Sequence, residues 1–120
     1  MARQLCRDNL MQISTVSTPI VSKFANDPVL GPLLKEFLID LPTQLDEIFA
    51  AIHAHDFSEV IRLCHRLKGD AATYGFPELA LVAHEGEQTS MRSSADPGSL
   101  MHISAELQVI GGRVVDSLKN

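Results

Sequence analysis

The stretch CHRLKGDAATYG, residues 64–75, brings a nucleophile, a cation and an unusual glycine together. His65 has a ring nitrogen that can attack an electrophile, and Lys68 places a positive charge one helical turn further on. Gly69 weakens a helix, so its presence needs a reason, and room for another molecule beside His65 is one. The alternative interpretation is structural: His65 is a boundary residue, and Gly69 lets two helices pack closely. The residues alone leave both interpretations open.

The element that must position His65 is a helix predicted over residues 57–73. Its apolar residues recur every three to four positions, as in one buried stripe. They are Phe57, Val60, Ile61, Cys64, Leu67 and Ala71. At about 100° per residue His65 lies at the edge of this stripe, so we expect its side chain to be half-exposed. Its neighbours on the helix surface are Ile61, Lys68, Gly69 and Ala72.

The rest of the chain is also expected to be helical, because no segment alternates polar and apolar residues as a strand would. Further helices are predicted over residues 28–54, 77–91 and 98–118, with weaker short ones over 1–12 and 19–25. Residues 13–18 are the expected loose connection, and 92–96 the expected last loop. Pro42 falls inside 28–54, where either the helix kinks or two helices meet.

Helix start and stop signals separate these segments. They are Asp27-Pro28, Asp56 with Glu59, Gly75-Phe76-Pro77 and Asp96-Pro97. Helices of this length with short connections favour an all-α, up-down antiparallel four-helix bundle, here with one or two extra short N-terminal helices. We expect a single domain over residues 1–120, with 1–18 as a loosely attached leading segment.

The bulk composition narrows the class of protein. The 120 residues are 45% hydrophobic and 21% charged, as in ordinary globular proteins, and the net charge of −5 disfavours nucleic acid and anionic membranes as partners. No apolar run is long enough for a membrane span or a signal peptide, which predicts a cytoplasmic protein. Cys64 occupies an apolar position, so we expect it to be buried rather than paired with Cys6.

The motif around His65 resembles a known signature. His65-Arg66-Leu67-Lys68-Gly69, with Gly75 ten residues after the histidine, is similar to the His-x-Leu-Lys-Gly signature of histidine-containing phosphotransfer (HPt) domains. The run 72–76 with Leu79, His84 and Glu87 resembles the phosphotransfer domain of chemotaxis histidine kinases. Upstream, PVLGPLLKEFLIDLPTQLDEIFAAI is similar to the leading helix of the family, including its proline. The similarity covers roughly residues 19–91.

The resemblance implies a phosphorelay role. His65 would accept a phosphoryl group from a histidine kinase or a receiver aspartate and pass it to the aspartate of a response-regulator receiver. The residues expected to support this site are Lys68, Gly69, His84 and Glu87, and those expected to contact the partner are Ile61, Arg62, Arg66, Ala72 and Gln88. We expect the Glu87 carboxylate to accept the Nδ1–H of His65 and leave Nε2 as the nucleophile. Many relatives have a glutamine near this position, but Gln88 lies about 100° further around the helix.

The resemblance also implies partners and cofactors. A sensor histidine kinase and a receiver domain are the expected partners, and the Mg²⁺ ion is expected in the receiver. We expect the chain itself to hold no cofactor or metal and to be a monomer. It contains no glycine-rich phosphate loop, which predicts a phosphocarrier rather than an enzyme that uses ATP. The initial Met and the terminal helix favour a free-standing protein over a piece of a larger kinase.

Two other functions remain as alternatives. The bundle could dock partners without ever being phosphorylated, although the complete His-x-Leu-Lys-Gly motif argues against this. Less favoured is a metal site built from His65, His84 and Glu87, since two histidines and a carboxylate suit Zn²⁺ or iron. Lys68 argues against the metal, because it places a positive charge beside the cation.

Overall fold

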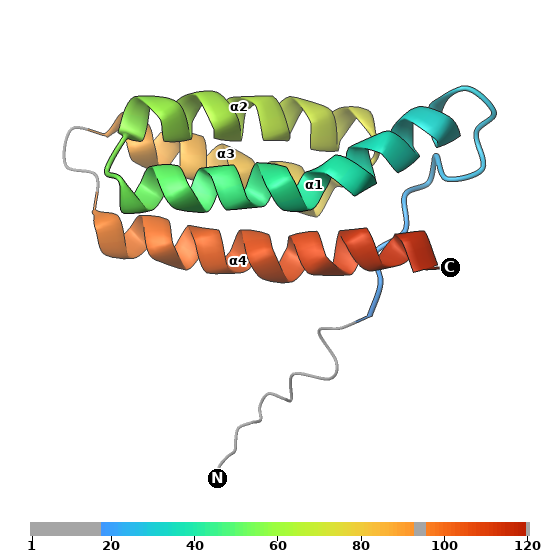
Figure 1. The fold of residues 1–120 in the computed structure, drawn as a ribbon. Helices are drawn as coiled ribbons and strands as arrows, with labels where there is room; N and C mark the ends of the chain where they lie inside the picture. Colours follow the sequence, from blue (N-terminus) through green and yellow to red (C-terminus); the bar gives the residue numbers. More distant parts are fainter. Residues whose placement is uncertain (1–17, 93–95, 120) are drawn as a thin grey trace, which may run out of the picture.

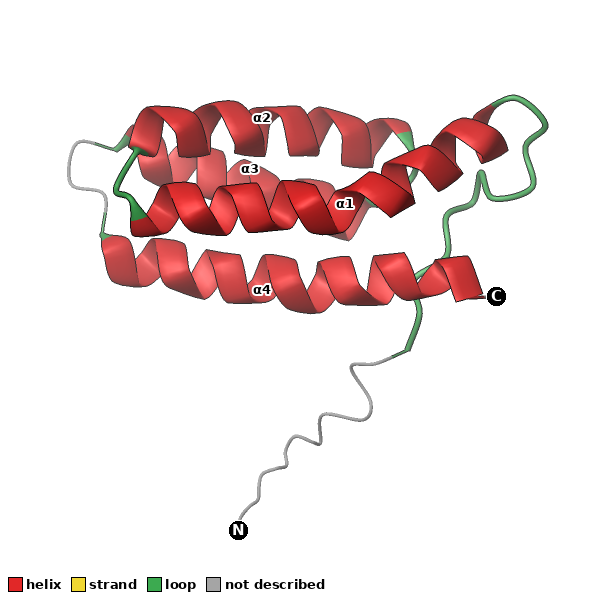
Figure 2. Cartoon of the chain, viewed as in Figure 1, coloured by secondary structure: helices red, strands yellow, loops and turns green. Residues whose placement is uncertain are grey.

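The structure is a computed structural model that describes residues 18–92 and 96–119 of the chain. Its described residues form four α-helices and a final turn of 3₁₀-helix: α1 Leu30–His53, α2 Phe57–Thr73, α3 Pro77–Met91, α4 Pro97–Val115 and η2 Asp116–Lys119. Successive α-helices run in opposite directions, and each packs against two others around a common core (Figure 1). The cartoon contains helices and loops but no strand in the described part (Figure 2). The predicted up-down four-helix bundle is therefore confirmed.

Each helix contributes one apolar stripe to the core. Fully buried residues include Leu41 and Ile48 of α1, Leu67 of α2, Leu79 of α3 and Leu107 of α4. Burying one such side chain contributes about 1.5–3 kcal/mol, which is what holds four amphipathic helices together. The predicted stripe of α2 is confirmed at its centre, with a small rotation. Leu63 joins the buried side, while Phe57 and Ile61 are only half-buried.

The helix boundaries follow the expected signals. The Asp56 carboxylate accepts a hydrogen bond from the Glu59 N–H and starts α2, and Asp96 does the same with the Gly98 N–H at the start of α4. Gly75 ends α2 in the left-handed conformation, at a φ of 84°, which a glycine adopts without strain. Asp27 accepts hydrogen bonds from the Val29 and Leu30 N–H groups, and α1 begins at Leu30 instead of residue 28.

Pro42 lies within one continuous helix, so the alternative of two helices meeting there is wrong. Figure 1 shows α1 bending as its colour passes from cyan to green. A proline inside a helix has no N–H to donate, and its ring crowds the carbonyl of the preceding turn. Both halves of α1 contribute to the core, with Leu38 buried before Pro42 and Ile48 buried after it.

The short helix expected over residues 19–25 is not formed. Residues 18–26 instead make a strap that crosses the end of the bundle, with turns at residues 23–26. The Ile20 N–H donates to the Arg113 carbonyl of α4, and the Ser22 hydroxyl donates to the Tyr74 carbonyl at 2.6 Å. Ser22 Oγ also accepts from the Phe24 N–H, and such local side-chain bonds compete with a helix. The helix predicted over residues 1–12 lies outside the described residues.

The helices of residues 18–92 and 96–119 include no candidate membrane span. None of the helices in these ranges combines the length and the apolar character needed to cross a bilayer.

Candidate functional site

The site is built by α2 and α3, the two helices joined by the tight turn at Gly75. Because they run antiparallel with a short connection, residues in the second half of α2 face residues in the middle of α3. This brings His65 and Lys68 of α2 together with His84 and Glu87 of α3. The four residues that were predicted to form the chemical centre are therefore neighbours.

Glu87 is the centre of this cluster. Its side chain is only 6% exposed, yet one carboxylate oxygen lies 2.7 Å from His65 Nδ1 and the other 2.7 Å from Lys68 Nζ. The hydrogen bond from the Lys68 ammonium is the main cause that lowers the pKa of Glu87. Burial acts in the opposite direction, and the hydrogen bond from His65 adds to the lowering. Glu87 is thus an ionised carboxylate at neutral pH.

This carboxylate determines which nitrogen of His65 carries the proton. An ionised carboxylate can only accept hydrogen bonds, so Nδ1 of His65 must donate to it. In the neutral ring the lone pair is then on Nε2. The imidazole is 68% exposed while its partner carboxylate is buried. The exposed imidazole is thus held in one tautomer by a buried carboxylate, and that carboxylate belongs to Glu87.

Lys68 links the second histidine to the same cluster. Its ammonium lies 3.4 Å from His84 Nδ1 and can only donate, so His84 accepts with the lone pair of that nitrogen. His84 Nδ1 also lies 3.8 Å from the carboxylate of Glu87. Lys68 is 30% exposed and His84 45% exposed, so both reach the surface next to His65.

Gly69 does not serve the packing of the bundle. Apart from the neighbouring backbone of α2, a Cβ built at this position would meet no atom of the described residues within 4 Å, and the residue is exposed. The structural explanation, in which this glycine lets two helices approach, is therefore wrong. Ala72, one turn further on, is also exposed. Gly69 and Ala72 thus place no large side chain on the surface beside His65.

Residues 32–112 match the family model described as the Hpt domain, which is more than half of the chain. The chain belongs to the Hpt domain family. The match begins in the first turn of α1, ends in α4 and includes the whole α2–α3 cluster. No curated protein and no solved structure matches the chain.

Membership assigns a general role. Hpt domains are phosphocarrier modules that exchange phosphoryl groups on histidine with kinases and response-regulator receivers in two-component systems. The HPt resemblance of the His65 motif is confirmed at the level of the family. The roles of the individual residues, and the finer similarity to chemotaxis kinases, stay predictions.

The other residues predicted to contact the partner surround His65 with mixed exposure. Ile61 is half-buried, while Arg62, Arg66, Ala72 and Gln88 are exposed. The Arg62 guanidinium donates two hydrogen bonds to Glu59, at 2.8 and 2.6 Å, and Arg66 lies 3.7 Å from Asp40. Arg62 and Arg66 of this Hpt domain are thus each paired with a carboxylate of their own chain.

One feature of the site was missed from the sequence. A Cβ at Gly86 would lie 2.8 Å from Cys64 Sγ, so this glycine allows α3 to approach α2 next to Glu87. The signal was a glycine in the middle of a helix, directly before the key carboxylate. Cys64 is buried and free, as expected, and burial raises the pKa of its thiol to about 12. It therefore stays neutral beneath the site.

The metal-site alternative finds no support in the described ranges. Within residues 18–92 and 96–119, no group of three or more His, Cys, Asp or Glu side chains has the geometry to hold a metal ion. His65, His84 and Glu87 do come together, but the Lys68 ammonium contacts both Glu87 and His84. A cation in that space would face a fixed positive charge.

Replacing Glu87 with Gln should lower the free energy of unfolding by about 1–3 kcal/mol at pH 7, because Lys68 loses a charged acceptor. Since the pKa of Glu87 is lowered from its ordinary 4.5 in the folded chain, its stabilisation is complete above about pH 4.5. This stabilisation is lost as the pH falls through the lowered pKa of Glu87 in the folded chain. The difference between parent and variant should therefore shrink on acidification. Urea unfolding between pH 7 and pH 3 measures it.

Glu85→Gln is the matched control, since this glutamate is exposed on the same helix. It removes the same charge without touching His65 or Lys68, so it should leave stability within about 0.5 kcal/mol of the parent. Equal losses in the two variants would contradict a special role for the buried carboxylate.

Proposed function

We propose that His65 is the phosphoryl acceptor of this Hpt domain. It takes the group from a sensor histidine kinase or a phosphorylated receiver aspartate and passes it to the aspartate of a response-regulator receiver. The observation that carries this proposal is the 2.7 Å contact of His65 Nδ1 with the buried, ionised Glu87, on a ring that is otherwise exposed. The complete His65–Gly69 motif supports it.

The chemistry needs little from the chain itself. Nε2 of His65 attacks the phosphorus of an aspartyl phosphate, an N–P bond forms, and the P–O bond to the aspartate breaks to release its carboxylate. The ring then carries a proton on Nδ1 and a phosphoryl group on Nε2, so it gains positive charge. The Glu87 carboxylate stabilises that charge. Transfer to the next receiver is the reverse reaction, with the Mg²⁺ ion supplied by the receiver.

Lys68 is proposed to stabilise the phosphoryl oxygens. Its ammonium binds the Glu87 carboxylate, which also contacts the His65 ring. The side chain is exposed enough to turn towards a group on Nε2. It cannot compete for the phosphoryl group at neutral pH, because a protonated amine has no lone pair.

Lys68→Ala should slow phosphoryl transfer roughly 10- to 100-fold, the equivalent of one charge-assisted hydrogen bond in the transition state. Rapid-quench measurement of label moving from a phosphorylated receiver to the variant checks this, with circular dichroism to show that the bundle is folded. Lys35→Ala, at an exposed position on α1, is the control and should transfer at the parental rate. An unchanged rate for Lys68→Ala would remove this lysine from the site.

A phosphotransfer screen tests the proposed function directly. The chain is mixed with the purified kinases and phosphorylated receivers of the organism from which it comes. We expect one phosphate per chain that is labile in acid and stable in alkali, as a phosphohistidine is. Acid-stable label would place the phosphate on another residue type. No transfer from any donor, while a known Hpt domain is labelled by the same set, would favour the docking bundle that is never phosphorylated.

A further inference from the structure

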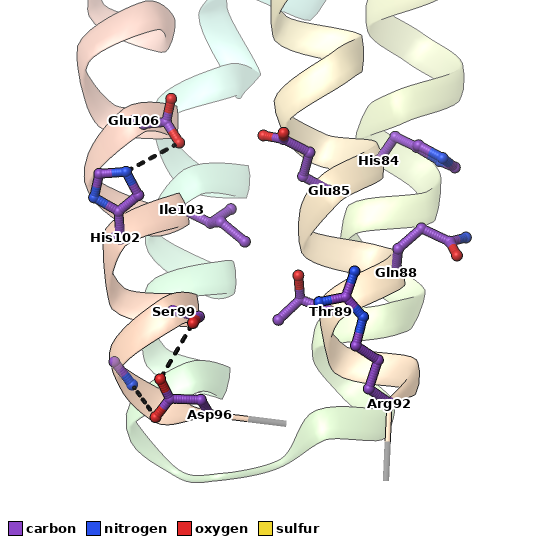
Figure 3. A pocket seen from close by; sticks show the side chains of 11 residues that line it. His84, Glu85, Gln88, Thr89, Arg92, Asp96, Ser99, His102, Ile103 and Glu106 are labelled. Atoms are coloured by element: carbon purple, nitrogen blue, oxygen red, sulfur yellow. Dashed lines mark hydrogen bonds and ion pairs between the residues drawn. The ribbon is translucent and has the colours of Figure 1, made fainter. Parts of the chain in front are cut away.

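A groove of about 770 Å³ lies between α3 and α4 (Figure 3). On α4 it shares His102 and Glu106 with a smaller, apolar hollow of about 260 Å³. We call the two together the α3–α4 groove. We propose that residues 1–17 of the chain dock along the α3–α4 groove as an amphipathic helix. This inference does not depend on the proposed function of His65.

The α4 wall of the groove is one continuous face of the helix. Its residues recur every three or four positions, which places them side by side along α4. They are His102, Ala105, Glu106, Val109 and Ile110. Val109 is 49% exposed, and Ala105 is exposed as well. The described residues thus leave an apolar strip of α4 in contact with solvent, and covering this strip would remove apolar area from water.

The strap holds residue 18 at the end of this same face. Arg113 lies one helical turn beyond Val109, and its Nε–H donates to the Thr18 carbonyl at 2.9 Å. The Ile20 N–H donates to the Arg113 carbonyl, which fixes the strap at the same residue a second time. Residues 1–17 are therefore attached at one end of the groove. Their docking is intramolecular, and the attachment gives them a high effective concentration there.

The length of the segment matches the length of the groove. A helix rises about 1.5 Å per residue, so a helix over residues 1–13 would be about 20 Å long. By the same rise, His102 and Arg113 lie about 17 Å apart along α4. Residues 14–17 then remain to join the docked helix to the strap.

The sequence of the segment has the pattern that an apolar wall requires. Four of its apolar residues fall on one side of a helix when placed at about 100° per residue. They are Leu5, Cys6, Leu10 and Ile13. Arg3 and Arg7 lie four residues apart, so they share one flank of that helix. The segment thus offers an apolar side for α4 and a basic flank beside it.

The charge of the groove is complementary to this basic flank. Figure 3 shows Glu85 of α3 and Glu106 of α4 projecting towards each other across the groove. Arg92 is the only Lys or Arg in its lining. The third carboxylate, Asp96, caps α4 and is already used there. Glu106 also lies 3.6 Å from His102, an imidazole that is charged only when protonated.

The charge of the whole chain divides in the same sense. Residues 1–17 hold two of the ten Lys and Arg but only one of the 15 Asp and Glu, so the remainder of the chain is more acidic than the total of −5. A basic segment is attracted to an acidic groove. A second copy of the chain fits this face less well, because a twofold interface would bring two acidic grooves together.

Cys6 reports docking in the full chain. It lies on the apolar side of the segment, so docking should shield its thiol from the neutral reagent N-ethylmaleimide. Cys64 does not compete, because it is buried and its pKa is raised to about 12. Alkylation of Cys6, followed by mass spectrometry, should be at least about fivefold slower in the chain than in a synthetic peptide of residues 1–17.

Val109→Gln is the test, with Ile39→Gln as its matched control. Each replaces an exposed β-branched side chain of a helix, 49% exposed at Val109 and 62% at Ile39, but Ile39 lies on α1 and lines no part of the groove. We expect Val109→Gln to raise the alkylation rate of Cys6 about threefold or more, and Ile39→Gln to leave it within about 1.5-fold of the parent. Circular dichroism checks that both variants are folded.

Three results would overturn the inference: a parental Cys6 that reacts as fast as the peptide, no response to Val109→Gln, or an equal response to Ile39→Gln. Protection of Cys6 that increases with protein concentration, together with a dimer in sedimentation, would assign the groove to a second copy and would also overturn it. Protection that is independent of concentration and is lost in Val109→Gln alone is the expected result.

Discussion

His65→Gln is expected to abolish phosphoryl transfer while the bundle stays folded. Glutamine offers no ring nitrogen with a lone pair, so no N–P bond can form at this position. Because the side chain is 68% exposed and an amide can still donate to Glu87, the free energy of unfolding should change by less than about 1 kcal/mol. Labelling from a phosphorylated receiver, read together with urea unfolding, measures both effects.

His102→Gln is the control for this experiment. It makes the same change at a histidine of α4 that is 77% exposed and lies 3.6 Å from Glu106. This variant should be labelled as fast as the parent chain. Phosphate that persists in His65→Gln, or that disappears in His102→Gln alone, would show that the acceptor has been assigned to the wrong histidine.

Gly69→Leu should block transfer from a receiver by a factor of roughly 100 or more without unfolding the protein, a loss of about 3 kcal/mol in transition-state binding. Apart from the neighbouring backbone of α2, no atom of the described residues lies within 4 Å of a Cβ at this position, so the new side chain is accommodated by the isolated bundle. It projects instead into the space that the receiver must occupy to reach His65. Transfer from the receiver should therefore be lost. Labelling by phosphoramidate, a small phosphoryl donor that needs no docking surface, should continue at the parental rate.

Gly69→Ala provides the graded comparison. Alanine is a better helix former than glycine by about 0.5–1 kcal/mol, and it meets nothing here, so this variant should unfold at a higher urea concentration than the parent. Its transfer rate should lie between those of the parent and Gly69→Leu. If the leucine variant transferred at the parental rate, the idea that Gly69 clears a path for the partner would be wrong.

The elements of the fold were largely readable from local patterns. The apolar spacing of α2, the caps at Asp56 and Asp96 and the stop at Gly75 all depend on residues within about one turn of each other. The exception is the strap. Residues 19–25 read as a short helix, but Ser22 and Ile20 bind carbonyls of Tyr74 and Arg113, which are distant in the sequence.

The candidate site, like the fold, has features that the sequence predicts and features that only the tertiary structure shows. The sequence by itself determined the motif from His65 to Gly69, the edge position of the histidine, and Glu87 as its expected partner. Helical phase and the family motif depend only on the order and spacing of residues along the chain. Only the tertiary structure decided that Lys68 shares Glu87 with His65 and that no other element of the described residues packs on Gly69. It also decided that Val21 and Leu81 line one groove, because distances between separate elements depend on how the helices pack.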